Sequence, residues 1–224
     1  MSVGQLTSVV YYNTMNERIR NLITPTVTAA AAVLALSSCT AAPAQPETPQ
    51  PTISAPVDTW EECKPILKDS SLARALDTNE NAHTAYDFLI GMGLPYVSAA
   101  AVTATMYYES RVDPNFSALD GTTKGILGWS QPSWSVLKKA AKVNKASPRS
   151  LDMQLEFFNT QITQYQSIPD HPEYAKLQAE LKYKPTLIGS VEAMRDNYTK
   201  AMPTNTCVTI AVASYVLQNY ERER

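Results

Sequence analysis

Glu109 is the residue whose surroundings in the sequence best suit acid chemistry. It follows Met106, Tyr107 and Tyr108 at the end of an uncharged segment, and a polar loop begins directly after it. Burial against these side chains and the negative end of a helix would both raise the pKa of its carboxyl group. A carboxyl group that stays protonated near neutral pH can donate a proton to the leaving oxygen of a glycosidic bond. Arg111 opposes this, because an ion pair with Glu109 would lower that pKa.

The loop after Glu109 offers two candidates for a second carboxylate. Asp120, which precedes Gly121, is the preferred one, and Asp113 is the alternative, although Asp before Pro is typical of a turn. Such a group would be the base of an inverting hydrolase or the nucleophile of a retaining one. If neither acid faces Glu109, then Glu109 acts alone as acid and later as base, while the N-acetyl or 6-hydroxyl group of the substrate completes the reaction. Hydrolysis and 1,6-anhydro formation both stay open.

A linked pattern surrounds Glu109. It consists of Glu109-Ser110, of Asp113-Pro114-Asn115 and of residues 125–131, Gly-Ile-Leu-Gly-Trp-Ser-Gln. The pattern resembles the Glu-Ser…Gly-x-x-Gly-x-x-Gln constellation of lysozyme-like peptidoglycan-cleaving domains, including soluble lytic transglycosylases. Residues 150–158, Ser-Leu-Asp-Met-Gln-Leu-Glu-Phe-Phe, are similar to a helix start of phage tail lysozyme domains.

This resemblance covers about Ala82 to Tyr165, and residues 89–96 look like the first helix-turn of that family. It implies a lysozyme-like fold in which Glu109 is the catalytic acid beside a small hairpin. The implied partner is the glycan strand of peptidoglycan, cut at the β-1,4 bond between N-acetylmuramic acid and N-acetylglucosamine, and no cofactor is implied. A surface module that binds glycan, or a phage or conjugation component, without turnover is the alternative function.

On the same resemblance, residues 125–131 would line a sugar-binding groove. Gly125 and Gly128 would let the backbone approach a sugar closely, and Gln131 offers an amide for a hydroxyl or N-acetyl group. Aromatic rings can stack on sugars, although core packing is the alternative for each of them. The candidates are Trp129, Trp134, Tyr107 and Tyr108, of which Trp129 lies within the glycine segment. The family often has Trp directly after this Gln, whereas this chain has Pro132, so the stacking residue stays open.

Helical patterns dominate the chain from residue 60 onward, with no β-rich run and no internal repeat. Asn81 is predicted to cap a helix that stops at Gly91 or Gly93, and Pro95 to open an uncharged helix to about Tyr108. The second of these should sit centrally, because it is apolar or small on all sides. Residues 113–124, rich in Asp, Asn, Gly and Thr, predict a loop or a short hairpin.

Further helices complete the expected fold. They are predicted over residues 134–142, 150–167, 173–183, 187–200 and 208–220, with Ser150 and Thr206 as caps. The fold class is therefore mainly α, a lysozyme-like helical domain with a small loop or hairpin insertion.

Residues 1–39 are interpreted as an export signal rather than as part of the fold. Two Arg precede the apolar run 27–36, and Leu-Ser-Ser-Cys39 resembles the bacterial lipobox. Cys39 would be diacylated, and Met15 is the expected true start. This interpretation predicts an exported protein, lipid-anchored to the outer face of the bacterial cytoplasmic membrane.

Residues 40–59 predict a Pro-rich disordered tether, and residues 60–224 the domain, which we expect to be a monomer. Cys63 and Cys207 are the only thiols that would remain after processing. In an exported protein such a pair favours a disulfide, with two buried free thiols as the alternative.

Composition and missing motifs exclude several classes of function. The chain has 224 residues, 44% of them hydrophobic, which allows one sizeable domain. A net charge of −2, with 19 basic and 21 acidic residues, argues against nucleic acid as a partner. With only two His, His83 and His171, and three Cys, no transition-metal cluster is predicted. The chain has no H-E-x-x-H, Cys-x-x-Cys, G-x-S-x-G or phosphate-binding glycine motif.

Overall fold

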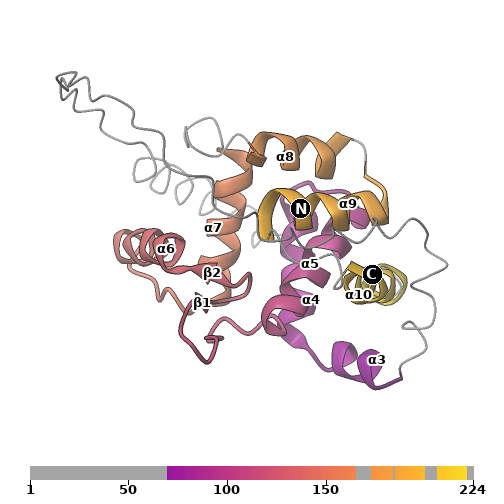
Figure 1. The fold of residues 1–224 in the computed structure, drawn as a ribbon, viewed down its shortest axis with the longest axis horizontal. Coiled ribbons are helices and arrows are strands. Elements are labelled where there is room, and N and C mark those ends of the chain that lie inside the picture. The colour runs from indigo at the N-terminus through magenta and orange to yellow at the C-terminus, as the bar shows by residue number, and fades with distance from the viewer. Residues whose placement is uncertain (1–69, 165–172, 184, 200–205, 221–224) are drawn as a thin grey trace, which may run out of the picture.

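The structure, a computed structural model, describes residues 70–164, 173–183, 185–199 and 206–220 (Figure 1). The predicted signal, the tether, Cys39 and Cys63 all lie outside the described residues. Within these ranges no helix has both the length and the apolar character required to cross a membrane.

Helices form nearly all of the regular structure in these ranges. The elements are α3 (Ser70–Asp77), α4 (Glu80–Gly91), α5 (Tyr96–Ser110), β1 (Thr123–Lys124), β2 (Trp129–Ser130), α6 (Gln131–Val143), α7 (Leu151–Thr163), α8 (Glu173–Tyr183), α9 (Leu187–Met194), the π-helical turn η3 (Arg195–Thr199) and α10 (Thr206–Tyr220). The predicted fold class, mainly α with a small hairpin, is confirmed.

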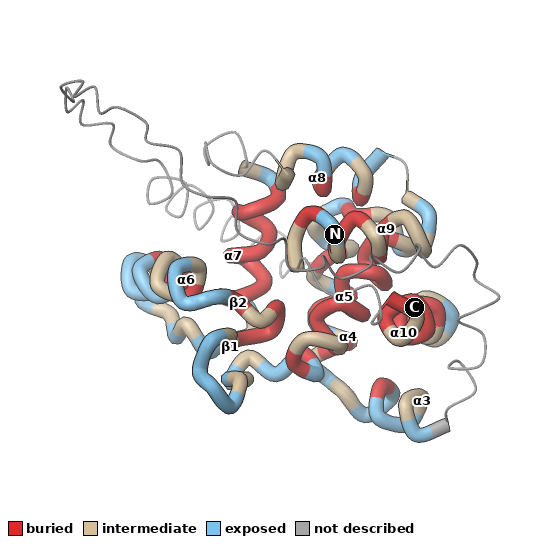
Figure 2. The backbone as a smooth tube through the Cα atoms, in the orientation of Figure 1, coloured by how far each residue is buried: buried red, intermediate tan, exposed pale blue. Residues whose placement is uncertain are grey.

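Helix α5 is the centre of the fold. Every residue from Ser98 to Tyr107 is buried, and α10, α9 and α4 pack against it, α10 most extensively (Figures 1 and 2). Alanine at four of these positions keeps the side chains short, so neighbouring helices can approach closely. The expectation that this uncharged segment sits centrally is confirmed.

Two of the predicted helix starts can be compared with the caps in the structure. Ser150 caps α7 as expected, because its hydroxyl accepts a hydrogen bond from the Met153 amide at 3.4 Å. The cap of α4, however, is Asn79 and not Asn81. The Asn79 side chain accepts from the Ala82 amide at 3.0 Å, whereas Asn81 already lies inside the first turn.

Other helix ends differ from the expected ranges by a few residues. Helix α5 continues to Ser110, which places Glu109 in its last turn. The helix expected over residues 187–200 is α-helical only to Met194 and then continues as η3. Helix α3 was not predicted, since eight residues are too few for a clear helical period.

The hairpin follows the polar loop after α5. Strands β1 and β2 pair antiparallel, with Thr123 opposite Ser130 and Lys124 opposite Trp129. A bridge between Ser117 and Lys124 extends this ribbon on the other side of β1. The prediction of a loop or short hairpin is confirmed, and the turn between the strands is formed by residues 125–128.

Candidate active site

Glu109 is half-buried in the last turn of α5, and burial raises the pKa of its carboxyl group. The competing effect expected from Arg111 is not seen. The Arg111 guanidinium lies over the Tyr107 ring, 4.6 Å from the ring centroid. Among the described residues no ion pair joins Arg111 to Glu109. The carboxyl group of Glu109 is therefore free of the contact that would have kept it charged.

The hairpin turn places Gly128 directly against this carboxyl group. Gly128 has a φ of 58°, and a Cβ atom at this position would lie 3.1 Å from Oε2 of Glu109. The same position lies 3.7 Å from Cβ and 3.9 Å from Oγ1 of Thr123. The absent side chain of Gly128 thus gives room to Glu109, and the approach of a sugar to Gly128 stays a prediction. The structure brings Glu109, Gly128 and Thr123 together.

Thr123 is a polar neighbour of Gly128, on the hairpin that approaches Glu109, and the sequence did not reveal it. A single Thr in a polar loop carries no motif signal. Only the pairing of β1 with β2, which sets Thr123 opposite Ser130, places its side chain beside Gly128.

Gly125 makes room for Gln154 of helix α7. A Cβ atom at Gly125 would lie 2.6 Å from Oε1 of Gln154 and 3.0 Å from the Trp129 ring. Because this space is filled by protein atoms and Gly125 is buried, the structure does not favour the approach of a sugar at this position. The φ of 74° at Gly125 also favours glycine.

Gln154 fixes the hairpin turn through all of its polar atoms. Its Oε1 accepts from the Ile126 amide at 2.9 Å, and its Nε2 donates to the Pro114 and Pro148 carbonyl groups at 2.8 and 2.9 Å. Its side chain is fully buried, so these bonds have no competition from water. The Gln of the helix start at residues 150–158 therefore has a positioning role that the motif alone did not disclose.

Ser110 connects the end of α5 to the same turn. Its hydroxyl lies within hydrogen-bond distance of the Ile126 carbonyl oxygen, at 3.0 Å, and of the Met106 carbonyl oxygen, at 3.1 Å. In the Glu-Ser pair, Glu109 thus supplies the carboxyl group, and Ser110 fixes the position of the helix end that contains Glu109.

Trp129 is part of the core, which does not favour its prediction as a sugar platform. Only 4% of Trp129 is exposed, and its ring packs edge-on against Phe157 with centroids 5.5 Å apart. Its indole N–H donates to the Tyr198 hydroxyl at 2.8 Å, and that hydroxyl donates to Oε1 of Gln161 at 2.5 Å. The π-helical turn η3 supplies Tyr198 to this chain of bonds.

Of the other predicted substrate contacts, two are buried and two are at least partly exposed. Trp134 and Tyr107 are buried, which leaves their ring faces no access to a sugar. Tyr108 is half-exposed beside Glu109, and Gln131 is exposed at the first position of α6. Both stay predictions as glycan contacts.

Asp120 serves the turn at the tip of the loop. Its Oδ1 accepts from the Thr122 amide at 3.0 Å and from the Thr122 hydroxyl at 2.7 Å, and these bonds lower the pKa of its carboxyl group. Asp113 likewise accepts from the Asn115 amide at 2.8 Å. Neither carboxylate contacts Glu109 in the described part of the chain, so a second catalytic carboxylate is not supported.

Glu156 on α7 is a second acid whose pKa is raised, in this case to about 7. Burial is the main cause; the Asn159 side chain opposes it, and the charge of Asp152 adds to it. Only 1% of Glu156 is exposed. It follows Gln154 by two residues, so it points to nearly the opposite side of the helix. It does not belong to the site around Glu109.

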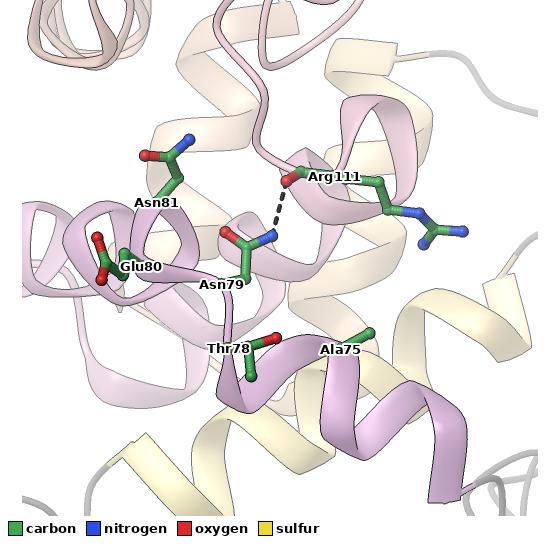
Figure 3. Close-up of a pocket in the computed structure, with 6 residues that line it drawn as sticks. All are labelled: Ala75, Thr78, Asn79, Glu80, Asn81 and Arg111. Atoms are coloured by element: carbon green, nitrogen blue, oxygen red, sulfur yellow. Dashed lines mark hydrogen bonds between the residues drawn. The ribbon is translucent and has the colours of Figure 1, made fainter.

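A pocket of about 420 Å³ lies next to the site (Figure 3), and residues that line it stabilise the chain segment after Glu109. It is lined by Ala75, Thr78, Asn79, Glu80, Asn81 and Arg111. The Asn79 amide donates to the Arg111 carbonyl oxygen at 2.8 Å, while the guanidinium points away from it. The Asn81 amide donates to the Val112 carbonyl oxygen at 3.1 Å.

These two bonds hold a strained segment. Arg111 and Val112 have φ values of 60° and 56°, which side-chain-bearing residues rarely adopt. The two Asn side chains thus fix the chain reversal that follows Glu109. No group of side chains suited to a metal ion occurs among the described residues.

Comparison with known proteins gives one match. The family model described as phage tail lysozyme matches residues 80–223. No curated protein and no solved structure matches the chain. The matched range contains α4 to α10, and with them Glu109, the hairpin and Gln154.

Proposed function

The chain belongs to the phage tail lysozyme family, and from this premise we propose that it cuts the β-1,4 bond between N-acetylmuramic acid and N-acetylglucosamine with Glu109 as general acid. Family membership indicates a lysozyme-like, peptidoglycan-cleaving glycosidase in general terms. One observation supports the role of Glu109. Its carboxyl group is half-buried, burial raises its pKa, and Arg111 does not form an ion pair with it.

The proposed reaction begins with the protonated carboxyl group. Glu109 donates its proton to the glycosidic oxygen as the bond between that oxygen and the anomeric carbon breaks, and positive charge develops on the sugar. The resulting Glu109 carboxylate then takes a proton from the group that attacks the anomeric carbon. The Thr123 hydroxyl, which lies beside Gly128, would offer that attacking group a hydrogen bond.

The attacking group decides between two products. Water gives a reducing end, and the 6-hydroxyl group of the sugar gives a 1,6-anhydro end, which is the lytic transglycosylase route. The Asp120 carboxylate is hydrogen-bonded to Thr122, and no described contact brings a second carboxyl group to Glu109. These observations favour a mechanism with a single carboxyl group. A non-catalytic glycan-binding module is the remaining alternative.

The proposed setting is a lipoprotein. The signal with its lipobox would anchor the protein through a diacylated Cys39, and the tether at residues 40–59 would hold the domain away from the membrane. A domain so placed would act on nearby wall glycan.

The test is cleavage of purified peptidoglycan by protein that begins after Cys39. Glu109→Gln should abolish product formation, because the amide keeps the shape of the side chain but has no acid proton. Asp120→Asn is the matched control on an exposed acid, and it should retain activity. Mass spectrometry of the products separates reducing ends from 1,6-anhydro ends. Cleavage by Glu109→Gln would refute the proposal, and glycan binding by the parent protein without any product would favour the non-catalytic module.

A further inference from the structure

Positive charge is concentrated in one stretch of this mildly acidic chain. Residues 121–151 contain five Lys and one Arg, and no Asp or Glu, although the net charge of the chain is −2. The six are Lys124, Lys138, Lys139, Lys142, Lys145 and Arg149, which we call the basic face. The balance over the whole chain conceals this local excess.

Helix α6 directs half of this charge into solvent. Its buried residues, Trp134, Leu137, Ala140 and Ala141, recur at helical spacing and share one side. At 100° per residue, Lys139 and Lys142 fall on the opposite side, and Lys138 lies at its border. All members of the basic face are exposed except Lys124, which is half-buried. Figure 2 shows α6 at the edge of the molecule with an exposed outer surface.

The charges of the basic face have no acidic partners among the described residues. The ion pairs there join Lys176 to Glu180 and Arg195 to Asp196. Lys138 and Lys142, four residues apart on one helix, repel each other, so the arrangement costs the fold stability. An anionic ligand would offset that cost.

The basic face begins at the hairpin that contacts Glu109. Gly128, against the carboxyl group, leads through β2 directly into Gln131, the first residue of α6. A helix of this length, 13 residues, extends about 20 Å at about 1.5 Å per residue. We expect a polymer that extends from Glu109 along α6 to meet these cations.

We propose that the basic face binds the carboxylates of the stem peptides carried by the same peptidoglycan strand that Glu109 cuts. This inference rests on the proposed function. The sugar backbone has few charges, whereas the peptide branches carry free carboxylates at intervals along the strand. Lys, a compact and flexible point charge, suits such dispersed and mobile anions, whereas Arg suits fixed bidentate contacts. The negative net charge disfavours a dense polyanion such as nucleic acid.

The test measures binding without turnover. Full-length protein with Glu109→Gln, solubilised in detergent, is sedimented with insoluble peptidoglycan whose carboxylates are either free or chemically amidated. Adding K138E, K139E and K142E should weaken binding to the free form about tenfold, at a few tenths to one kcal/mol per contact. Amidation should weaken the parent equally and the triple variant no further. The matched control, R74E with K176E and K182E, changes the net charge by the same amount on other exposed residues and should bind as the parent does.

Circular dichroism checks that every variant is folded. Equal weakening in the control triple, or parent binding that is insensitive to amidation, would overturn the inference. So would binding to phosphatidylglycerol vesicles that depends on K138E, K139E and K142E while peptidoglycan binding does not, since the face would then serve a membrane. If the active protein fails to cleave peptidoglycan but this binding pattern holds, the proposed function fails and the binding surface stands.

Discussion

At the level of single residues, the proposed chemistry depends on the surroundings of the Glu109 carboxyl group. Burial raises its pKa, the hydrogen atom of Gly128 leaves space for one of its oxygens, and Arg111 is occupied with the Tyr107 ring. Burial and the missing ion pair with Arg111 favour the protonated carboxyl group, which is the form that a general acid needs, and Gly128 leaves this group its space.

The pH dependence of cleavage should follow from the raised pKa of Glu109. A general acid works in its protonated form, so activity should be present below this pKa and fall as the pH rises through it. Because burial raises the pKa above the ordinary value of 4.5, this fall should lie above that pH. Initial rates across a pH series measure it.

Glu156 is the control, since its own pKa of about 7 offers another explanation of the same fall. Glu156→Gln should leave the pH at which activity falls unchanged. If the fall in activity disappeared in Glu156→Gln, the fall would belong to Glu156 and not to Glu109.

Gly128→Ala tests the close contact with Glu109, and Gly121→Ala is its matched control. Both glycines have positive φ values, 58° and 70°, so each substitution should cost about 1–2 kcal/mol of stability. The new methyl group at Gly128 would lie 3.1 Å from Oε2 of Glu109. A methyl group at Gly121 would have nothing within 4 Å. We expect kcat to fall strongly in Gly128→Ala alone, as measured on folded protein. Equal losses in both variants would contradict the contact.

At the level of elements, the site is a junction between the end of α5, the hairpin and the start of α7. Ser110 joins the first two, and Gln154 joins the hairpin to α7. Because the hairpin strands have only two residues each, their own pairing gives little stability. The side-chain bonds from the two helices therefore determine where Gly128 lies.

Gln154→Leu should displace the hairpin from Glu109. It removes three hydrogen bonds and leaves the buried Ile126 amide without a partner, which costs about 1–3 kcal/mol. We expect a lower melting temperature, a lower kcat and a changed pH profile, because the surroundings of Glu109 change. Gln178→Leu, on half-exposed α8 surface, is the control and should change none of these. A normal pH profile in folded Gln154→Leu would show that Gln154 serves stability alone.

At the level of the whole molecule, the central helix α5 is covered by α10, which begins beside Cys207. A disulfide between Cys207 and Cys63, which stays a prediction, would close a loop around nearly the whole domain. It would tie α10 to a residue before α3 and so restrict the unfolded chain.

Reduction of this disulfide should lower the free energy of unfolding by up to about 5 kcal/mol. Denaturant titrations with and without reductant measure the change, and Cys63→Ser and Cys207→Ser should each abolish the effect of reductant. Mass spectrometry of non-reduced peptides identifies the link. Alkylation of both thiols in folded, non-reduced protein would exclude it.

The sequence by itself indicated the helices other than α3, the central place of α5 and Glu109 as the candidate acid, because capping residues, helical period and short motifs are local signals. The tertiary structure alone decided what these residues touch. Contacts between segments distant in the chain place Gln154 against Gly125, Gly128 against Glu109 and Trp129 in the core. Local patterns cannot rank such contacts, since a ring that could stack on a sugar could equally fill a core.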